Sequence, residues 1–161
     1  MASVVIGISD MNVVKGNDSI ITYALGSCVG VALYDDIKKI AGLAHVMMPS
    51  STEIVDRSLN VMKYADTAVP ELVKRMARMG ASQYSLTAKI AGGAEMFSMV
   101  GAGNKFNIGE RNIAAVKAAL QLLHIKIVAQ DVGENYGRTV ELFAANGIYR
   151  IKAISKGIKD I

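Results

Sequence analysis

Short apolar runs separated by polar turns occupy the first third of the chain. Runs rich in β-branched residues at 4–8, 20–25, 29–34 and 40–48 predict four strands, because each run has strand length and ends near a turn-forming residue. The run at 29–34 carries no charge on either of its alternating sets of side chains, which is typical of a strand between two layers. This part of the chain therefore predicts a sheet that is covered on both faces.

Two longer segments have apolar residues three or four positions apart, which is helical spacing. The first predicted helix runs over 58–79, with Gly80 as its C-terminal stop and Pro70 as the place of a kink or restart. The second predicted helix runs over 111–123 and is also amphipathic. Each helix therefore has an apolar face that can pack on a sheet.

The remaining apolar runs predict further strands at 85–90, 125–132, 139–145 and 148–154. The last two flank Asn146-Gly147, a pair typical of a two-residue hairpin turn. Together the elements predict a single domain over residues 1–161, of the α/β class. We expect a layered α/β sandwich with a mixed, largely antiparallel sheet and two main helices.

Composition excludes several functional classes. Hydrophobic residues make up 52% of the chain and charged residues 20%, which indicates a compact globular protein. The net charge of +4 is scattered and the aromatic content of 6% includes no Trp, so we expect no nucleic-acid partner. The N-terminus lacks the basic segment of a signal peptide, and no uncharged stretch is long enough to span a bilayer. We therefore expect a cytoplasmic protein with no membrane insertion.

A cysteine and a histidine in the first hairpin are the candidate chemistry. Cys28 is the only cysteine, so no intrachain disulfide can form. A turn centred between Asp36 and Ile37 would place Cys28 directly opposite His45 on the same face, where opposed Cβ atoms are roughly 4.5–5.5 Å apart. Gly30 would leave room on that face. The spacing therefore predicts that a thiol and an imidazole approach each other, provided that the register holds.

Such a pair can activate a nucleophile. A free thiol has a pKa of about 8.5, and a neighbouring imidazole can take its proton. The break at Gly26-Ser27 would expose Cys28, and the backbone N–H groups of Ser27 and Cys28 could hold a developing oxyanion. Thr22, on the preceding strand, is the nearest upstream candidate to orient the His45 ring.

Other interpretations of the same residues stay open at this point. A lone cysteine in an apolar strand is often a small buried hydrophobe, and a lone histidine is often a satisfied core residue. His124 is the only other histidine, and one cysteine with two histidines makes a poor set of zinc ligands. We therefore expect no metal and no cofactor. The segment 101–103 begins like a dinucleotide fingerprint, but Phe106 occupies the third glycine position.

The residues around the candidate pair resemble the CheD chemoreceptor glutamine deamidases. The resemblance is carried by Thr22–Asp35 and Gly42–Pro49, and it continues through Lys63–Asp66, Ala88–Phe97, Asn107–Asn112, Asp131–Gly133 and Gly137-Arg138. One departure is visible, because the family commonly shows a glycine pair where this chain has Gly133-Glu134. The shape of that loop is therefore an open question.

The resemblance implies a nucleophile at Cys28, a catalytic histidine at His45 and a third catalytic residue at Thr22. Members of the family hydrolyse selected glutamine side chains of methyl-accepting chemotaxis receptors to glutamate. Some members are also described as methylesterases. Members of the family bind the CheC phosphatase in organisms that have it. The implied fold is an α/β sandwich related to bacterial deamidating toxins.

We therefore expect a protein-glutamine glutaminase that releases ammonia through a cysteine thioester and uses no cofactor. Two alternatives are a receptor glutamate methylesterase and a module that mainly binds and regulates a CheC-type phosphatase.

Overall fold

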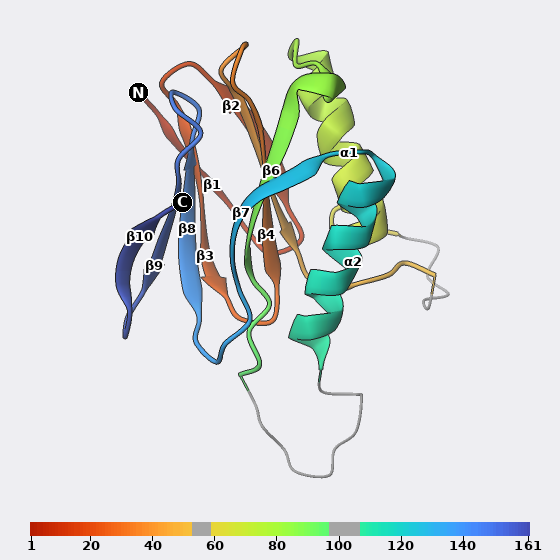
Figure 1. The fold of residues 1–161 in the computed structure, drawn as a ribbon, viewed down its shortest axis with the longest axis vertical. Helices are drawn as coiled ribbons and strands as arrows, with labels where there is room; N and C mark the ends of the chain where they lie inside the picture. The colour runs from red at the N-terminus through yellow and green to blue at the C-terminus, as the bar shows by residue number, and fades with distance from the viewer. Residues whose placement is uncertain (53–58, 97–106) are drawn as a thin grey trace.

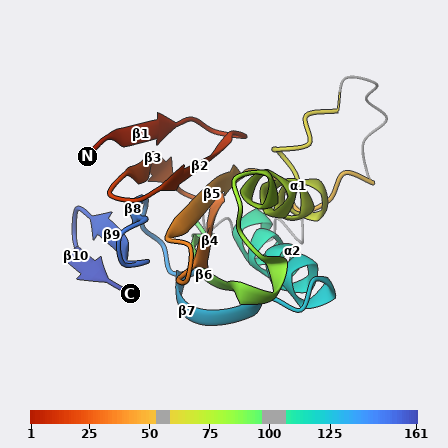
Figure 2. The same cartoon turned by 90° about the horizontal axis from the view of Figure 1, so that it is seen from above.

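Two β-sheets pack face to face, and two helices cover the outer face of one of them (Figures 1 and 2). In this computed structural model, residues 1–52, 59–96 and 107–161 are described, and the elements counted here lie within them. The predicted layered α/β sandwich with two main helices is therefore confirmed. Both sheets are mixed and largely antiparallel, since only β1–β3 and β6–β7 pair in parallel.

The first sheet has the strand order β1-β3-β8-β9-β10. Its strands are β1 (Ser3–Ile6), β3 (Ser19–Leu25), β8 (Arg138–Phe143), β9 (Tyr149–Ala153) and β10 (Gly157–Asp160). The second sheet has the order β2-β5-β4-β6-β7. Its strands are β2 (Met11–Lys15), β5 (Ile40–Val46), β4 (Val29–Asp35), β6 (Leu86–Gly92) and β7 (Lys126–Val132). A short 3-10 helix, Gln83–Ser85, leads into β6.

The second sheet is the central layer of the molecule. Every residue of β4 and β5 is buried. One apolar core lies between this sheet and the helices, and another lies between the two sheets. The prediction that the run at 29–34 lies between two layers is therefore confirmed.

The helices lie side by side on the central sheet (Figure 2). Helix α1 is Ala65–Arg78, and it continues through Pro70 without a restart. It begins later than predicted because Tyr64 is extended and forms an isolated bridge with Met48. The helix ends just before Gly80, the predicted stop, whose φ is 108°.

Helix α2 is Ile108–Leu122, so it begins three residues earlier than predicted. Within the described residues, neither helix is long and apolar enough to cross a bilayer. Most of the Gly-rich segment before α2, including 101–103, lies outside the described residues.

The turn between β4 and β5 lies one residue later in the chain than the sequence predicted, and this changes the register. The ladder closes at Asp35 opposite Ile40, which places His45 opposite Gly30 and not opposite Cys28. The predicted direct pairing of Cys28 with His45 is therefore wrong. The shift amounts to two residues, and side chains alternate with a period of two, so the face that each side chain occupies is unchanged.

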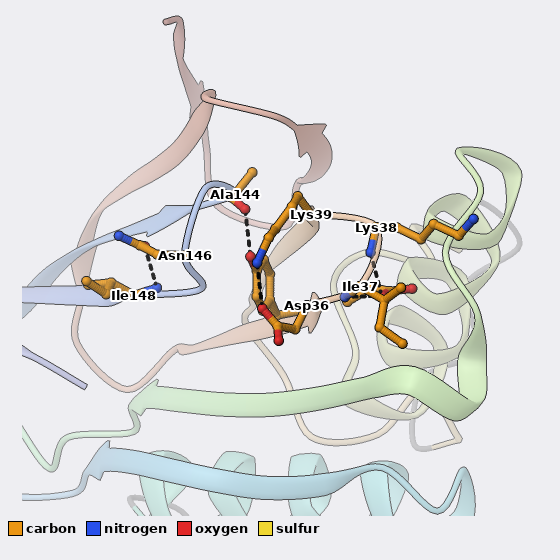
Figure 3. Close-up of polar contacts among 9 residues, drawn as sticks. Asp36, Ile37, Lys38, Lys39, Ala144, Asn146 and Ile148 are labelled. Carbon is orange, nitrogen blue, oxygen red and sulfur yellow. Dashed lines mark hydrogen bonds and ion pairs between the residues drawn. The ribbon is translucent and has the colours of Figure 1, made fainter.

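The conformation of this turn explains its position (Figure 3). The Asp35 carboxylate accepts hydrogen bonds from the N–H groups of Ile37 and Lys38, both at 3.0 Å. Lys39 then adopts a left-handed conformation with φ 55° and closes the turn. Left-handed backbone at a lysine has no clear sequence signal, since Gly, Asn and Asp are the residues that favour it.

The second predicted hairpin is also present, but its turn is longer than predicted. Strands β8 and β9 pair as predicted, but the ladder closes with Leu142 opposite Tyr149. Asn146 accepts a hydrogen bond from the N–H group of Ile148 at 3.0 Å (Figure 3), and Gly147 has φ 74°. The Asn146-Gly147 pair therefore lies at the end of a longer turn instead of forming a two-residue turn.

The loop after β7 answers the question raised by Gly133-Glu134. Glu134 has φ 62°, a left-handed conformation that glycine adopts without strain. The loop is anchored on both sides, because Gly133 donates to the Gly92 carbonyl at 2.9 Å and Glu95 donates to the Glu134 carbonyl at 2.9 Å. The glutamate therefore fits the loop at a conformational cost.

We expect Glu134→Gly to stabilise the protein by about 0.5–1 kcal/mol, because the left-handed penalty at Glu134 exceeds the extra chain entropy that a glycine loses on folding. Urea unfolding at neutral pH measures the change. The matched control is Asn135→Gly in the same loop, at an exposed residue whose φ is not positive. That control should lower stability, and an equal loss in Glu134→Gly would contradict the prediction.

Candidate active site

Two buried polar side chains meet between the sheets. His45 lies on β5 of the central sheet and Thr22 on β3 of the other sheet, and both are 0% exposed. The Thr22 Oγ1 atom lies 2.7 Å from Nδ1 of the His45 ring. The residue selected from the sequence to orient the imidazole is therefore in hydrogen-bond contact with it.

The hydrogen bonds of Thr22 determine the tautomer of the ring. Its hydroxyl donates to the carbonyl of Ile6 at 3.1 Å. A hydroxyl has one proton to donate, so Thr22 Oγ1 must accept a hydrogen bond from Nδ1–H of His45. The Nε2 atom then carries the lone pair, and it is buried with no hydrogen-bond partner among the described residues. Such an orphaned buried acceptor is costly, which makes it a candidate proton acceptor for chemistry.

Burial also keeps the ring neutral. Desolvation lowers the pKa of His45 from 6.5 to about 4, and the nearby charge of Asp10 only partly opposes this effect. At neutral pH the imidazole is therefore an uncharged base with its Nε2 lone pair available.

Cys28 lies between β3 and β4, where the chain leaves one sheet for the other. The β3–β8 ladder shifts register between Thr22 and Leu25, and Ala24 has φ 60°, so a bulge turns the strand toward the loop. Cys28 is half-buried and packs against the core between the sheets. It therefore faces the same layer as His45.

The thiol is held mainly in its protonated form. Burial raises the pKa of Cys28 above its ordinary value, and a hydrogen bond with its own backbone partly offsets this rise. Since Nε2 of His45 has no partner among the described residues, the thiol and the ring are not hydrogen-bonded here. Catalytic hydrogen bonds often form only when substrate is bound.

The loop Gly26–Cys28, which carries the candidate nucleophile, is held in place through its carbonyl groups. Three consecutive carbonyls accept hydrogen bonds from the segment after β6 and from α2: Gly26 from Ala94 N–H at 2.8 Å, Ser27 from Asn112 Nδ2 at 2.9 Å, and Cys28 from Gly93 N–H at 2.8 Å. All three hydrogen bonds are accepted by backbone atoms of the loop. None of them therefore depends on the Cys28 side chain.

Glycines allow the segment after β6 and the start of α2 to pack closely around this loop. Gly92 has φ 106°, and a side chain there would collide with the Cys28 carbonyl. A side chain at Gly109, in the first turn of α2, would collide with the carbonyl of Gly93. The sequence alone predicted no role for Gly92, Gly109 or Asn112. The signal available was their place in Ala88–Phe97 and Asn107–Asn112, two of the segments through which the resemblance continues.

The space at Gly30 is used for packing. Tyr149 of β9 is fully buried, and its hydroxyl donates to the Gly30 carbonyl at 3.1 Å. A side chain at Gly30 would collide with that hydroxyl. The expected room on this face is therefore filled by a tyrosine from the opposite sheet.

The remaining titratable groups do not extend the site. The second histidine, His124, is exposed beyond the end of α2. Among residues 1–52, 59–96 and 107–161, no three His, Cys, Asp or Glu side chains are grouped so as to hold a metal ion.

Comparison with known proteins gives a consistent result. The sequence model of the family described as CheD chemotactic sensory transduction matches residues 47–153. A protein of Lachnoclostridium phytofermentans named probable chemoreceptor glutamine deamidase CheD is 49% identical over 97% of this chain and 96% of its own length.

Two further relatives cover the same shares of both chains. The chemoreceptor glutamine deamidase CheD of Halalkalibacterium halodurans is 46% identical, and a probable one from Clostridium botulinum is 47% identical. At this identity along nearly its whole length, with a match to the family's own sequence model as well, the chain belongs to the CheD family.

Proposed function

We propose that this protein is a protein-glutamine glutaminase that converts glutamine side chains of chemotaxis receptors to glutamate. The single observation that carries the proposal is the neutral His45 ring, which Thr22 fixes with a bare Nε2 in the layer that the Cys28 thiol faces. Relatives that are 46–49% identical bear the name chemoreceptor glutamine deamidase, which supports the substrate class.

The first half of the proposed reaction forms a thioester. The Cys28 sulfur attacks the side-chain carbonyl carbon of the glutamine while its proton passes to Nε2 of His45. The backbone N–H groups of Ser27 and Cys28 hold the oxyanion that develops. The imidazolium then gives its proton to the leaving nitrogen, the C–N bond breaks, and ammonia departs.

The second half returns the enzyme to its starting state. A water molecule attacks the thioester carbon while its proton passes to Nε2 of His45. The C–S bond breaks, the proton returns to the Cys28 sulfur, and the side chain leaves as glutamate. One water molecule is consumed and one ammonia is released, and no cofactor takes part.

The electrostatics of the site suit the step in which the imidazolium donates its proton. The low pKa of His45 makes its imidazolium a strong acid, which favours proton transfer to the leaving nitrogen. The raised pKa of Cys28 keeps the thiol neutral until substrate is bound. Throughout the cycle, the Thr22 hydroxyl would hold Nδ1 protonated, because its own proton is committed to the Ile6 carbonyl.

The intact mass of a purified receptor, measured after incubation with this protein, tests the proposal. Deamidation adds about 1 Da per site, whereas ester hydrolysis of a methylated glutamate by the same acyl chemistry removes about 14 Da. A gain of about 1 Da per site is expected. If several receptors show only the loss, the methylesterase alternative is correct, and if none changes mass the enzyme proposal fails.

Two further parts of the proposal come from the sequence and not from the geometry of the site. Binding to a CheC-type phosphatase is one, and a cytoplasmic location is the other. Co-purification with a CheC-type protein would test the first. Fractionation of cells that produce the protein would test the second.

A further inference from the structure

Asn112 connects the two segments that carry the candidate catalytic pair. It lies near the start of α2 and is 0% exposed. Its Nδ2 atom donates to the Ser27 carbonyl at 2.9 Å and to the Met47 carbonyl at 3.0 Å. Ser27 directly precedes Cys28, and Met47 lies two residues after His45. One amide group therefore bridges the nucleophile loop and the end of β5.

The chemistry of the bridge matches an amide group. A carboxamide NH₂ has two protons to donate, and both acceptors are backbone carbonyls that side-chain substitution cannot remove. The Oδ1 atom of the same side chain is buried without a partner among the described residues. An unpaired buried oxygen destabilises a protein, so the residue is poorly suited to a purely packing role.

The helix that carries Asn112 has a fixed position. Its first turn presses against the segment after β6, since side chains at Gly93 or Gly109 would collide across this contact. Figure 1 shows the start of α2 at the same end of the molecule as the connection between β3 and β4. The amide therefore extends from a rigid element to both segments.

We propose that Asn112 is a positioning residue that sets the separation between the Cys28 thiol and the His45 ring. The residue acts through two backbone carbonyls and does not touch the substrate. The consequence for catalysis rests on the proposed function, whereas the coupling of thiol and ring does not. Displacement of reacting groups by about 1 Å lowers turnover about 100-fold, so the loss of the bridge should affect kcat far more than KM.

The test compares Asn112→Leu with Val116→Ala. Leucine has nearly the shape of asparagine but donates no hydrogen bond. Val116 is buried one turn further along α2, so its truncation lowers stability without removing a bridge. The first readout is the rate at which iodoacetamide alkylates Cys28 as a function of pH, which requires no receptor. His45→Gln gives the reference profile for a thiol without its imidazole.

We expect Asn112→Leu to shift the alkylation profile toward faster reaction at lower pH, because the released loop exposes the half-buried thiol, while Val116→Ala keeps the wild-type profile. In the receptor assay, kcat should fall about 100-fold for Asn112→Leu with little change in KM. A wild-type profile and kcat in folded Asn112→Leu would overturn the inference, as would an equal change in Val116→Ala. If no receptor is deamidated by wild type, the proposed function fails while the alkylation profiles still decide the role of Asn112.

A second variant covers the case in which Asn112→Leu does not fold. Asn112→Ser retains one donor, so it should shift the alkylation profile in the direction expected for Asn112→Leu but by a smaller amount. An unshifted profile in Asn112→Ser would then overturn the inference.

Discussion

Cys28→Ala is expected to lower the rate of glutamine deamidation on the order of 10⁴-fold or more, because loss of a nucleophile leaves only binding and oxyanion contacts. The chain has no second cysteine to replace it. The protein should remain folded, since the loop is held through the carbonyls of Gly26, Ser27 and Cys28. The measurement is the fraction of receptor that gains mass in a timed incubation, together with a thermal unfolding curve.

Two further variants sharpen this test. Cys28→Ser keeps the shape of the side chain but not its acidity, so it should lose nearly as much activity as Cys28→Ala. Tyr84→Ala removes a side chain that is 99% exposed and should retain wild-type activity. Deamidation by Cys28→Ala at more than a hundredth of the wild-type rate would rule out a cysteine nucleophile.

His45→Gln is expected to reduce activity by at least about 10³-fold, because it removes the general base. It should also change how stability depends on pH. The ring titrates near pH 4 in the folded protein and near pH 6.5 in the unfolded chain, so the unfolded chain binds more protons between these values. The wild-type free energy of unfolding therefore falls by roughly 3 kcal/mol from this group as the pH is lowered from 6.5 to 4.

Urea unfolding of both proteins between pH 4 and pH 8 measures this difference. Above pH 6.5 the contribution of His45 is constant, and below it the stability gap between the two proteins should narrow or reverse. His124→Gln changes the exposed second histidine and should retain full deamidase activity. A stability gap that stays constant down to pH 4 would mean that the buried ring is not held neutral.

The elements of the fold were largely predictable because their signals are local. Strand runs and helical spacing placed both helices and most strands, but β2 and β10 were not predicted. Strand β10 has no buried residue and carries charges, so it has no strand-like apolar run. The division of the strands into two sheets depends on pairings between distant segments, such as β3 with β8, for which no local pattern exists.

The proximity of Thr22 to His45 was predicted from the sequence, whereas the register of the hairpin was not. The register of β4 and β5 depends on the left-handed conformation of Lys39, which the sequence does not signal. The two-residue error kept Cys28 and His45 on one face, so the pair was identified in spite of it. The bridge by Asn112 joins residues 85 positions apart, and only the folded chain brings them together.

The contact between Thr22 and His45 has a consequence for when the protein becomes active during folding. The two residues belong to different sheets, and neither sheet alone can assign the tautomer of the imidazole. A folding intermediate with both sheets formed but not docked would carry the thiol without a working base. Pairings between distant strands form slowly. The Thr22–His45 contact is therefore complete only once the two sheets have docked, and the recovery of activity during refolding should report that step.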